Sequence, residues 1–510
     1  MYIAWVSTPS CRRCINMWNP FEILRDDFIG DKGSWLFHVA LYAILGLSTL
    51  FTIILITLPS QYHPYKEKPL RAKNERGEKI KLKRKDEKNN VHFKAGRTTQ
   101  IVVLGDIGRS PRMQYHAISI AKHGGKVYLV GYQESEVHPD VASSDLITIV
   151  PLALSPSILR SSSKLLFPIL APLKALHQSW TLYRALGYTS EPARYMLVQS
   201  PPSIPTLAIA TIVSFIRNTE LVIDWHNFGY SILALKLGAS HPLVNISALY
   251  ENAFSRLASQ HITVTHAMAR VLKDSYGVTA HALHDRPAAL FRPLNASERS
   301  KFLARLPETA PYAQDLAKGS WKLIVSSTSW TADEDFSLFL AALETYSARA
   351  TSQVSLPKIL AIITGKGPQK EHYLSLVKKM EQEKKLRNVV IRTAWLTPGN
   401  YATLLGAADL GVSLHTSSSG VDLPMKVVDM FGAGLPVIGW GDFEAWPELV
   451  KEDVNGKGFN SSEQLAGQLV ELFGSKDSVL PTLKKGAVEE SKNRWDDEWD
   501  RVGGKLFRLV

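Results

Sequence analysis

Residues 420–437 read GVDLPMKVVDMFGAGLPV and carry the most specific local pattern in the chain. Asp422 precedes an expected helix whose early turn holds Lys426 and whose next turn holds Asp429. The amides at the start of a helix favour phosphate, and a carboxylate one turn later suits ribose hydroxyls. The helix then meets glycine before a buried strand. The pattern predicts a helix-to-strand unit of an α/β fold; the alternative is an amphipathic helix with exposed charges.

The same alternation of apolar runs with helical patterns extends over the rest of the chain from residue 98 onward. The expected strands are Ile101–Leu104, Val127–Gly131, Leu146–Val150, Tyr195–Gln199, Leu221–Asp224, Ile262–Thr265, Leu323–Val325, Ile359–Thr364, Val389–Arg392, Leu410–Leu414 and Val437–Ile438. Strands that alternate with helices form parallel sheets. We therefore expect two doubly wound, Rossmann-like domains, 98–292 and 293–510, whose strand-end loops face a common cleft.

Two clusters in the first expected domain follow strands. Residues 105–112 form a glycine-containing turn with Asp106, Gly108, Arg109 and Arg112, where bare amides favour an anion or a sugar hydroxyl. A tight turn needs glycine in any case. Residues 224–230 crowd titratable and aromatic groups at the end of a strand, although these side chains also suit a core.

Two further clusters follow strands in the second domain. Residues 326–331 offer hydroxyls next to a helix start, which suits phosphate oxygens, although an ordinary helix-capping run explains the same residues. Residues 364–368 combine glycines with Lys366, so that the backbone can approach a diphosphate beside a positive charge.

An apolar stretch near the N-terminus predicts a membrane anchor. Residues 35–58 would form a helix about 36 Å long, enough to cross a bilayer. Residues 60–97 hold thirteen Lys or Arg against five acidic residues, and positive flanks stay cytosolic. We expect a luminal tail over 1–34, a transmembrane anchor over 35–58 and a basic linker over 59–97, with the rest of the chain in the cytosol.

The formal charge of +12 does not indicate nucleic-acid binding. Most of the excess lies in that linker, and the chain has no zinc-finger spacing and no aromatic RNA-binding signature. No nucleic-acid partner is expected. The only cysteines, Cys11 and Cys14, leave the body of the chain without a disulfide, which suits a reducing compartment.

Five long segments together resemble a known group of enzymes. They are GDIGRSPRMQYHAISIAKHGGKVYLVGY (105–132), DWHNFGYSILAL (224–235), SSTSWTADEDFSLFLAAL (326–343), TGKGP (364–368) and DLPMKVVDMFGAGLPV (422–437). The chain resembles GT-B glycosyltransferases and, within them, the eukaryotic chitobiosyldiphosphodolichol β-mannosyltransferases. The resemblance implies a GT-B fold and transfer of mannose from GDP-mannose to chitobiosyl-diphosphodolichol, with inversion to a β-1,4 linkage.

The resemblance also implies roles for residues. An inverting transfer needs a general base, and four candidates stay open: Asp106, Asp224, His226 and Glu251. The expected donor-binding residues are Gly108, Arg109, Ser327, Thr328, Lys366, Asp422, Met425, Lys426, Val427 and Asp429. The expected acceptor-binding residues are Arg112, Tyr230, Leu165 and Phe167. No metal ligands and no obligatory cofactor are expected, although a divalent cation is allowed for as an activator.

One departure concerns the broader retaining pattern, in which two glutamates flank the nucleotide helix. Here Asp422 and Asp429 stand at those ends, seven residues apart, so the glutamate roles do not transfer directly.

The expected partners are GDP-mannose, chitobiosyl-diphosphodolichol, membrane lipid and other early mannosyltransferases of the same lipid-linked assembly. Residues 153–187 mix apolar and basic side chains in a way that suits a segment in the membrane interface, or a helical layer on the sheet. The expected location is the endoplasmic reticulum membrane, with a single pass. Two alternatives remain: a GT-B transferase with another donor, such as UDP-N-acetylglucosamine, and a catalytically silent scaffold for such enzymes.

Overall fold

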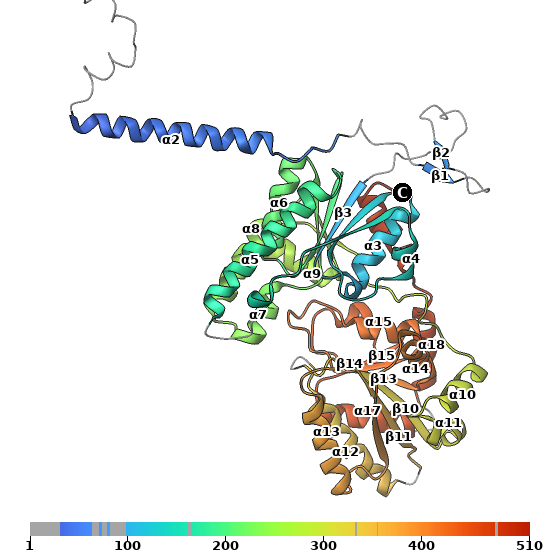
Figure 1. Cartoon of the computed structure of the whole chain (residues 1–510). Coiled ribbons are helices and arrows are strands. Elements are labelled where there is room, and N and C mark those ends of the chain that lie inside the picture. Colours follow the sequence, from blue (N-terminus) through green and yellow to red (C-terminus); the bar gives the residue numbers. More distant parts are fainter. Residues whose placement is uncertain are drawn as a thin grey trace, which may run out of the picture. The chain divides into compact units, whose positions relative to one another are not determined.

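The computed structural model describes residues 31–63, 71–73, 79–81, 98–160, 166–331, 334–353, 355–474 and 478–510. The chain divides into two compact units, Met1–Pro59 and Ser60–Val510, which are described separately. The first contains helix α2 (Asp31–Ile56), drawn in blue in Figure 1. Within the described parts of the chain, we find no helix that has both the length and the apolar character to traverse a membrane. The crossing predicted for residues 35–58 is therefore not shown, although α2 occupies most of that stretch.

The second unit begins with a short antiparallel hairpin, β1 (Arg71–Lys73) and β2 (Lys79–Lys81), inside the predicted linker. A seven-stranded parallel sheet follows, in the order β5-β4-β3-β6-β7-β8-β9. Its strands are β3 (Thr98–Asp106), β4 (Lys126–Tyr132), β5 (Ile147–Pro151), β6 (Tyr195–Ser200), β7 (Glu220–Trp225), β8 (Gln260–Thr263) and β9 (His281–Ala282). The parallel arrangement confirms the doubly wound fold predicted for the first domain.

The second sheet has six parallel strands in the order β12-β11-β10-β13-β14-β15. They are β10 (Trp321–Ser327), β11 (Lys358–Thr364), β12 (Val389–Ala394), β13 (Leu410–Ser413), β14 (Val437–Trp440) and β15 (Gly456–Phe459). Every strand expected from the sequence is present. Besides β1 and β2, the sequence missed β9, which has two residues, and β15, which starts with glycine.

Helices cover both sheets (Figure 1). Those of the first domain are η2 (Ile107–Arg109), α3 (Pro111–Lys122), α4 (Pro139–Ser143), η3 (Ser157–Arg160), α5 (Phe167–Arg184), η4 (Ala185–Thr189), α6 (Thr206–Arg217), α7 (Gly229–Leu237), α8 (Pro242–Ser255), α9 (His266–Val271) and η5 (Leu272–Tyr276). Those that follow are α10 (Ala296–Arg305), η6 (Ala310–Tyr312), α11 (Ala313–Lys318), α12 (Phe336–Ser352), α13 (Lys370–Gln382), α14 (Pro398–Ala407), α15 (Met425–Gly432), α16 (Trp446–Leu449), α17 (Ser462–Gly474), α18 (Leu480–Glu490), α19 (Trp495–Trp499) and η7 (Asp500–Gly504).

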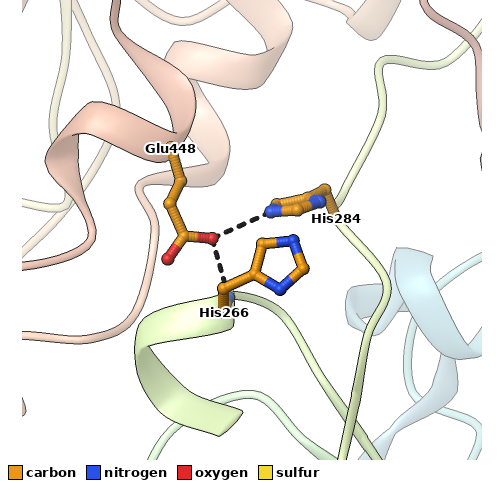
Figure 2. Close-up of side chains that lie close together, drawn as sticks. All are labelled: His266, His284 and Glu448. Carbon is orange, nitrogen blue, oxygen red and sulfur yellow. Dashed lines mark hydrogen bonds and ion pairs between the residues drawn. The ribbon is translucent and has the colours of Figure 1, made fainter. Parts of the chain in front are cut away.

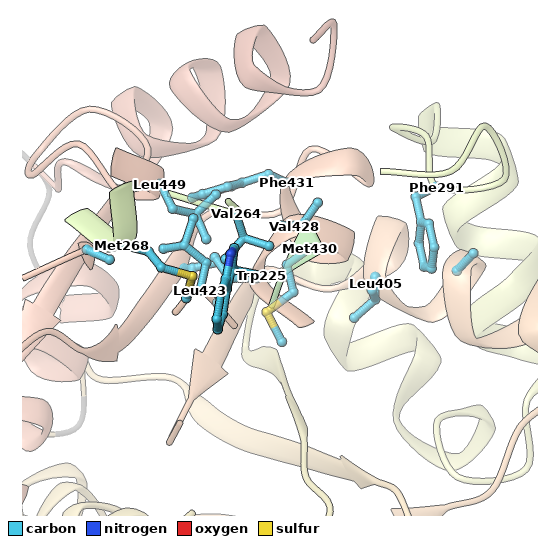
Figure 3. Close-up of a cluster of buried hydrophobic side chains, with 14 of the residues drawn as sticks. Trp225, Val264, Met268, Phe291, Leu405, Leu423, Val428, Met430, Phe431 and Leu449 are labelled. Atoms are coloured by element: carbon cyan, nitrogen blue, oxygen red, sulfur yellow. The ribbon is translucent and has the colours of Figure 1, made fainter. Parts of the chain in front are cut away.

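One hydrophobic core runs through the junction between the two domains. Trp225 and Met268 of the first domain belong to the same buried cluster as Leu423, Phe431 and Leu449 of the second. Figure 3 shows these side chains gathered between strands and helices of both domains. Because burial of such side chains contributes about 1.5–3 kcal/mol each, the junction is a stable interface. The loops at the strand ends of the two sheets are therefore held against each other.

The last part of the chain packs on the first domain. Trp495, Trp499 and Phe507, which lie within the stretch 293–510 predicted as the second domain, are buried in the hydrophobic core around the first sheet. The indole of Trp499 donates to His116 Nδ1 of α3 at 2.9 Å. The two tryptophans of α19, together with Phe507 just after η7, supply large apolar side chains that pack against α3.

Candidate functional site

A pocket of about 200 Å³ lies at the junction of the two domains. It is lined by Arg109, Ser110, Pro111, Arg112, Gln199, His226, Val264, Asp285, Leu423 and Met425. The first eight residues lie at or just after the carboxyl ends of strands of the first domain, whereas Leu423 precedes α15 and Met425 is its first residue. Predicted donor, acceptor and catalytic residues thus meet at one place, at the carboxyl ends of parallel strands.

Arg112 and Asp224 form a buried ion pair beneath this pocket. Arg112 Nε and Nη2 donate to the two oxygens of Asp224 at 2.9 and 3.0 Å, and Nη1 donates to Asp285 at 2.8 Å. Burial lowers the pKa of Arg112, but the charges of Asp224 and Asp285 outweigh it and raise that pKa above its ordinary value. Arg112, expected to bind acceptor, is therefore a permanent buried cation that organises the site.

His226 lies at the pocket with its ring oriented by Asp224. Its Nε2 is 2.8 Å from Asp224 Oδ2, and the side chain is partly exposed. Burial raises the pKa of Asp224, yet Arg112 and His226 together bring it well below its usual range. An ionised carboxylate that holds one imidazole nitrogen leaves the other nitrogen to exchange protons.

Asp106 serves a different purpose in the structure. Its Oδ1 accepts from the amides of Gly108, Glu134 and Ser135 at 3.3, 3.1 and 3.1 Å. Burial raises the pKa of Asp106, but these hydrogen bonds leave it below the ordinary value. The carboxylate joins the loop after β3 to the loop after β4, and it is not among the side chains that line the junction pocket.

Glu251 lies on α8, in a separate pocket of the first domain. Its Oε1 accepts from Ser203 Oγ at 2.5 Å and from the amide of Gly229 at 2.8 Å. Burial raises the pKa of Glu251 to about 7. The sequence grouped Glu251 with the residues of the junction, whereas the structure places it beside them.

The second domain contributes a polar cluster around Lys426. Its ammonium group pairs with Glu334 Oε1 and donates to Ser329 Oγ at 3.2 Å. Glu334 Oε2 accepts from Thr328 Oγ1 at 2.7 Å and from the amide of Ser329 at 2.5 Å. Two predicted clusters, 326–331 and 420–437, therefore meet, and Glu334, which was not among the predicted site residues, bonds to both.

The glycine-containing loop after β11 packs directly on this cluster. A Cβ at Gly365 would lie 1.8 Å from Thr328 O, and Gly365 has φ +124°. Lys366 Nζ lies 4.0 Å from the ring centroid of Trp395, an exposed aromatic that follows β12. Trp395 was missed by the sequence; its signal is an aromatic side chain just past the carboxyl end of the edge strand β12.

The segment before α15 is fixed by its own hydrogen bonds. Asp422 accepts from Ser417 and, at 3.2 Å, from Ser419, and it lies 3.2 Å from His415 Nε2. Burial raises the pKa of Asp422, but His415 and Ser417 lower it below the ordinary value. Met425 lines the junction pocket. Val427, a predicted donor residue, is fully buried with its amide bonded to Pro424 O, so its side chain faces the core instead.

Asp429 faces the first domain from one turn further along α15. Burial and the nearby charge of Asp285 raise the pKa of Asp429 to about 8. Burial and then the charge of Asp429 raise the pKa of Tyr401, and Tyr401 OH lies 2.9 Å from Ser327 Oγ. Asp429 and Ser327, both predicted to bind the donor, therefore both lie near Tyr401.

The remaining acceptor predictions fall elsewhere. Tyr230 is half-buried on α7 and packs against Phe228 at a centroid distance of 5.5 Å. Leu165 lies outside the described residues, and Phe167 begins α5.

A group of potential metal ligands also bridges the domains. His266, His284 and Glu448 bring ligand atoms within 4.8 Å of one another, and Figure 2 shows Glu448 pointing toward both histidine-bearing segments. Glu448 already accepts from the amides of His266 and Ala267 at 2.7 Å each, and from His284 at 2.9 Å. Burial lowers the pKa of His284, but its bonds to Glu448 and Glu498 raise it to about 9. The group is an ion-paired link between domains.

Comparison with known proteins gives close relatives. A chitobiosyldiphosphodolichol beta-mannosyltransferase of Arthroderma benhamiae is 52% identical, covering 74% of this chain and 85% of that protein. The Homo sapiens protein of the same name is 40% identical, covering 80% and 91%. An Arabidopsis thaliana relative named UDP-glycosyltransferase TURAN is also 40% identical, covering 80% and 97%. Protein-family models were searched and none matches.

Solved structures show the same fold at low identity. The chain is similar to Anabaena HepE in complex with UDP and glucose, with TM-score 0.56, 15% identity and coverage of 81% of this chain and 99% of that one. It is also similar to WaaG, a glycosyltransferase involved in lipopolysaccharide biosynthesis, with TM-score 0.55, 13% identity and coverage of 81% and 99%. These neighbours confirm the GT-B fold. On the identity and coverage of its relatives, the chain belongs to the chitobiosyldiphosphodolichol beta-mannosyltransferase family of glycosyltransferases.

Proposed function

We propose that the protein transfers mannose from GDP-mannose to chitobiosyl-diphosphodolichol with inversion, forming a β-1,4 linkage. The observation that carries this proposal is the junction pocket, where His226, oriented by an ionised Asp224, faces residues that lead into α15. A base on one side and a cationic nucleotide site on the other is the arrangement that glycosyl transfer needs.

His226 is the base that the geometry favours. With Nε2–H donated to Asp224, Nδ1 has a free lone pair that takes the proton of the attacking acceptor hydroxyl. Asp224 then stabilises the imidazolium, as Arg112 keeps that carboxylate ionised. The two aspartate candidates are less suited to be the base. Asp224 is fully buried and already bonded to Arg112 and His226, and Asp106 accepts hydrogen bonds from three amides.

The donor diphosphate is held by the second domain. Lys426 and Lys366 supply positive charge, and the hydroxyls and amides from Ser327 to Ser329 supply donors. As the sugar–phosphate bond breaks, charge develops on the leaving diphosphate, and these groups stabilise it. Asp429 is assigned to the ribose hydroxyls. No metal is required for this charge balance, so we expect transfer to persist in EDTA.

The protein works at a membrane, since the acceptor is a lipid. The exposed side chains of α2 include Tyr42, Ile44, Leu47 and Phe51, a surface that suits bilayer contact. We place the enzyme on the endoplasmic reticulum membrane with its body in the cytosol, as the basic residues of the linker favour. Flotation of the full chain with and without residues 1–59 on liposomes tests the attachment: equal flotation of both would contradict it.

The decisive experiment uses radiolabelled GDP-mannose and a synthetic chitobiosyl-diphosphate lipid. A labelled lipid product with a β linkage supports the proposal, and the absence of product overturns it. Because one relative is named as a UDP-glycosyltransferase, a second experiment tests which nucleotide the protein binds. GDP should protect the enzyme against thermal unfolding while UDP does not; protection by UDP alone would favour a different donor.

A further inference from the structure

The first domain contains a second pocket, of about 340 Å³, that the reaction described above does not use. It is lined by Pro201, Pro202, Ser203, Ile204, Gly229, Ile232, Leu233, Lys236, Ser247 and Glu251. The volume is within the range of roughly 300–1,000 Å³ that small-molecule sites occupy. A cavity of this size with mostly apolar walls is suited to bind the apolar part of a small molecule.

The pocket adjoins the junction pocket. Gln199 and His226 line the junction pocket, whereas Pro201 and Gly229, two and three residues further along the same loops, line this one. From Gly229, one face of α7 continues the wall to Lys236, about 10 Å away at the rise of an α-helix. A molecule whose reacting end lies at His226 can therefore extend along α7.

Glu251 marks the pocket as a built site. Its side chain is fully buried, and Oε2 has no hydrogen-bond partner in the part of the chain that the structure describes. A buried polar atom without a partner costs about 1–3 kcal/mol, which a ligand with a matching group recovers. Since burial raises the pKa of Glu251 to about 7, the group is often protonated near neutrality and then donates a hydrogen bond without repelling an anion.

The surface around the pocket is apolar and free of exposed acids. Large exposed apolar side chains gather on α5 to α8, namely Ile169, Leu173, Leu176, Trp180, Ile212, Phe215, Leu235, Leu237, Leu243, Ile246 and Leu249. On α5 they recur at helical spacing along one face. Among the residues of α5, α6, α7 and α8, Glu251 is the only acid, and Lys174, Arg184 and Lys236 are exposed bases. Such a surface complements an anionic lipid.

We propose that this pocket binds the isoprenoid diphosphate of the acceptor, with Lys236 and Glu251 Oε2 at the diphosphate and the apolar faces of α7 and α8 against the first isoprene units. The inference rests on the proposed function and deepens it. It assigns the lipid route to α7 and α8, which lie outside the segment 153–187 that the sequence offered as one candidate for the membrane interface.

Photocrosslinking tests the site without any need for sugar transfer. The full chain in liposomes is irradiated with a diazirine-bearing isoprenoid diphosphate, and labelled peptides are mapped. We expect labels on residues 201–204, α7 and α8, and at least a fivefold loss of label in Ile232→Trp, which fills the pocket. Leu257→Trp, exposed in the same domain outside the pocket, is the matched control. Labels confined to other segments, or unchanged labelling of Ile232→Trp, would overturn the inference.

Kinetics separate this inference from the proposed function. Lys236→Ala should raise KM for a long-chain acceptor about tenfold, with KM for GDP-mannose unchanged, because a charge-assisted contact to phosphate is lost. Lys273→Ala, also exposed in this domain, should leave both constants unchanged. If the wild type transfers mannose and Lys236→Ala behaves like it, the pocket assignment fails while the function stands. If the wild type labels as expected but transfers no mannose, the function fails while the pocket stands.

Discussion

Arg112 forms a bidentate ion pair with Asp224, in which Nε donates to Oδ2 at 2.9 Å and Nη2 donates to Oδ1 at 3.0 Å. The same Oδ2 lies 2.8 Å from His226 Nε2. A residue of α3 thereby fixes the charge of a carboxylate at the end of β7, and that carboxylate fixes the ring that faces the junction pocket.

Loss of the ion pair between Arg112 and Asp224 should destabilise the first domain. Arg112→Leu leaves Asp224 buried without its cation, and we expect a loss of about 3–5 kcal/mol in the free energy of unfolding. Urea denaturation measures it. Arg109→Ala removes an exposed guanidinium 3.5 Å from Asp106 and should change stability by less than about 0.5 kcal/mol. Equal losses in both variants would contradict the role assigned to Arg112.

His226→Asn should lower kcat by about 10²-fold or more, with KM for GDP-mannose unchanged, because the base is lost and the donor site is untouched. The thermal midpoint should stay close to that of the wild type, since the ring is partly exposed. Asp106→Asn is the comparison: if it abolishes turnover in a folded protein and His226→Asn does not, the base is assigned wrongly.

Lys426→Ala should raise KM for GDP-mannose by about ten- to a hundredfold, because the diphosphate loses a charge-assisted contact. Steady-state kinetics at several donor concentrations give the value. Lys457→Ala removes a lysine of the same domain that pairs with Asp453 and Glu471, and its donor KM should match that of the wild type.

The interdomain pair between His284 and Glu448 should make stability depend on pH. The folded pKa of His284 is raised to about 9, so the stabilisation is complete below about pH 6.5 and is lost as pH rises through 9. We expect the free energy of unfolding to fall by an amount on the order of 1–3 kcal/mol between these two pH values. Denaturant unfolding at a series of pH values measures this fall. In His284→Gln that slope should vanish; persistence of the slope would assign it to another group.

Gly365→Ala should destabilise the second domain by about 1–3 kcal/mol and weaken donor binding, because the new Cβ would strike Thr328 O at a positive φ. Gly399→Ala provides the control, as a Cβ there meets nothing within 4 Å. Calorimetry compares the two, and a neutral Gly365→Ala would show that the loop after β11 can move away from β10.

The sequence predicted eleven strands of the two parallel sheets, because buried parallel strands appear as continuous apolar runs such as Ile359–Thr364. It also identified residues that converge, since parallel strands end at one edge. It could not separate Glu251 from His226, because their positions relative to each other depend on how α7 turns back onto α8. Nor could it show that Glu334 pairs with Lys426, a contact between side chains 92 residues apart.

The placement of Trp499 and Phe507 in the core around α3 sets an order of events during synthesis. Residues 98–292 leave the ribosome first, yet their fold lacks part of its interior until residues 495–509 have emerged. The first domain therefore cannot complete its hydrophobic core until the C-terminal segment has been synthesised. A premature stop codon after residue 490 would therefore damage the part of the enzyme that was made first.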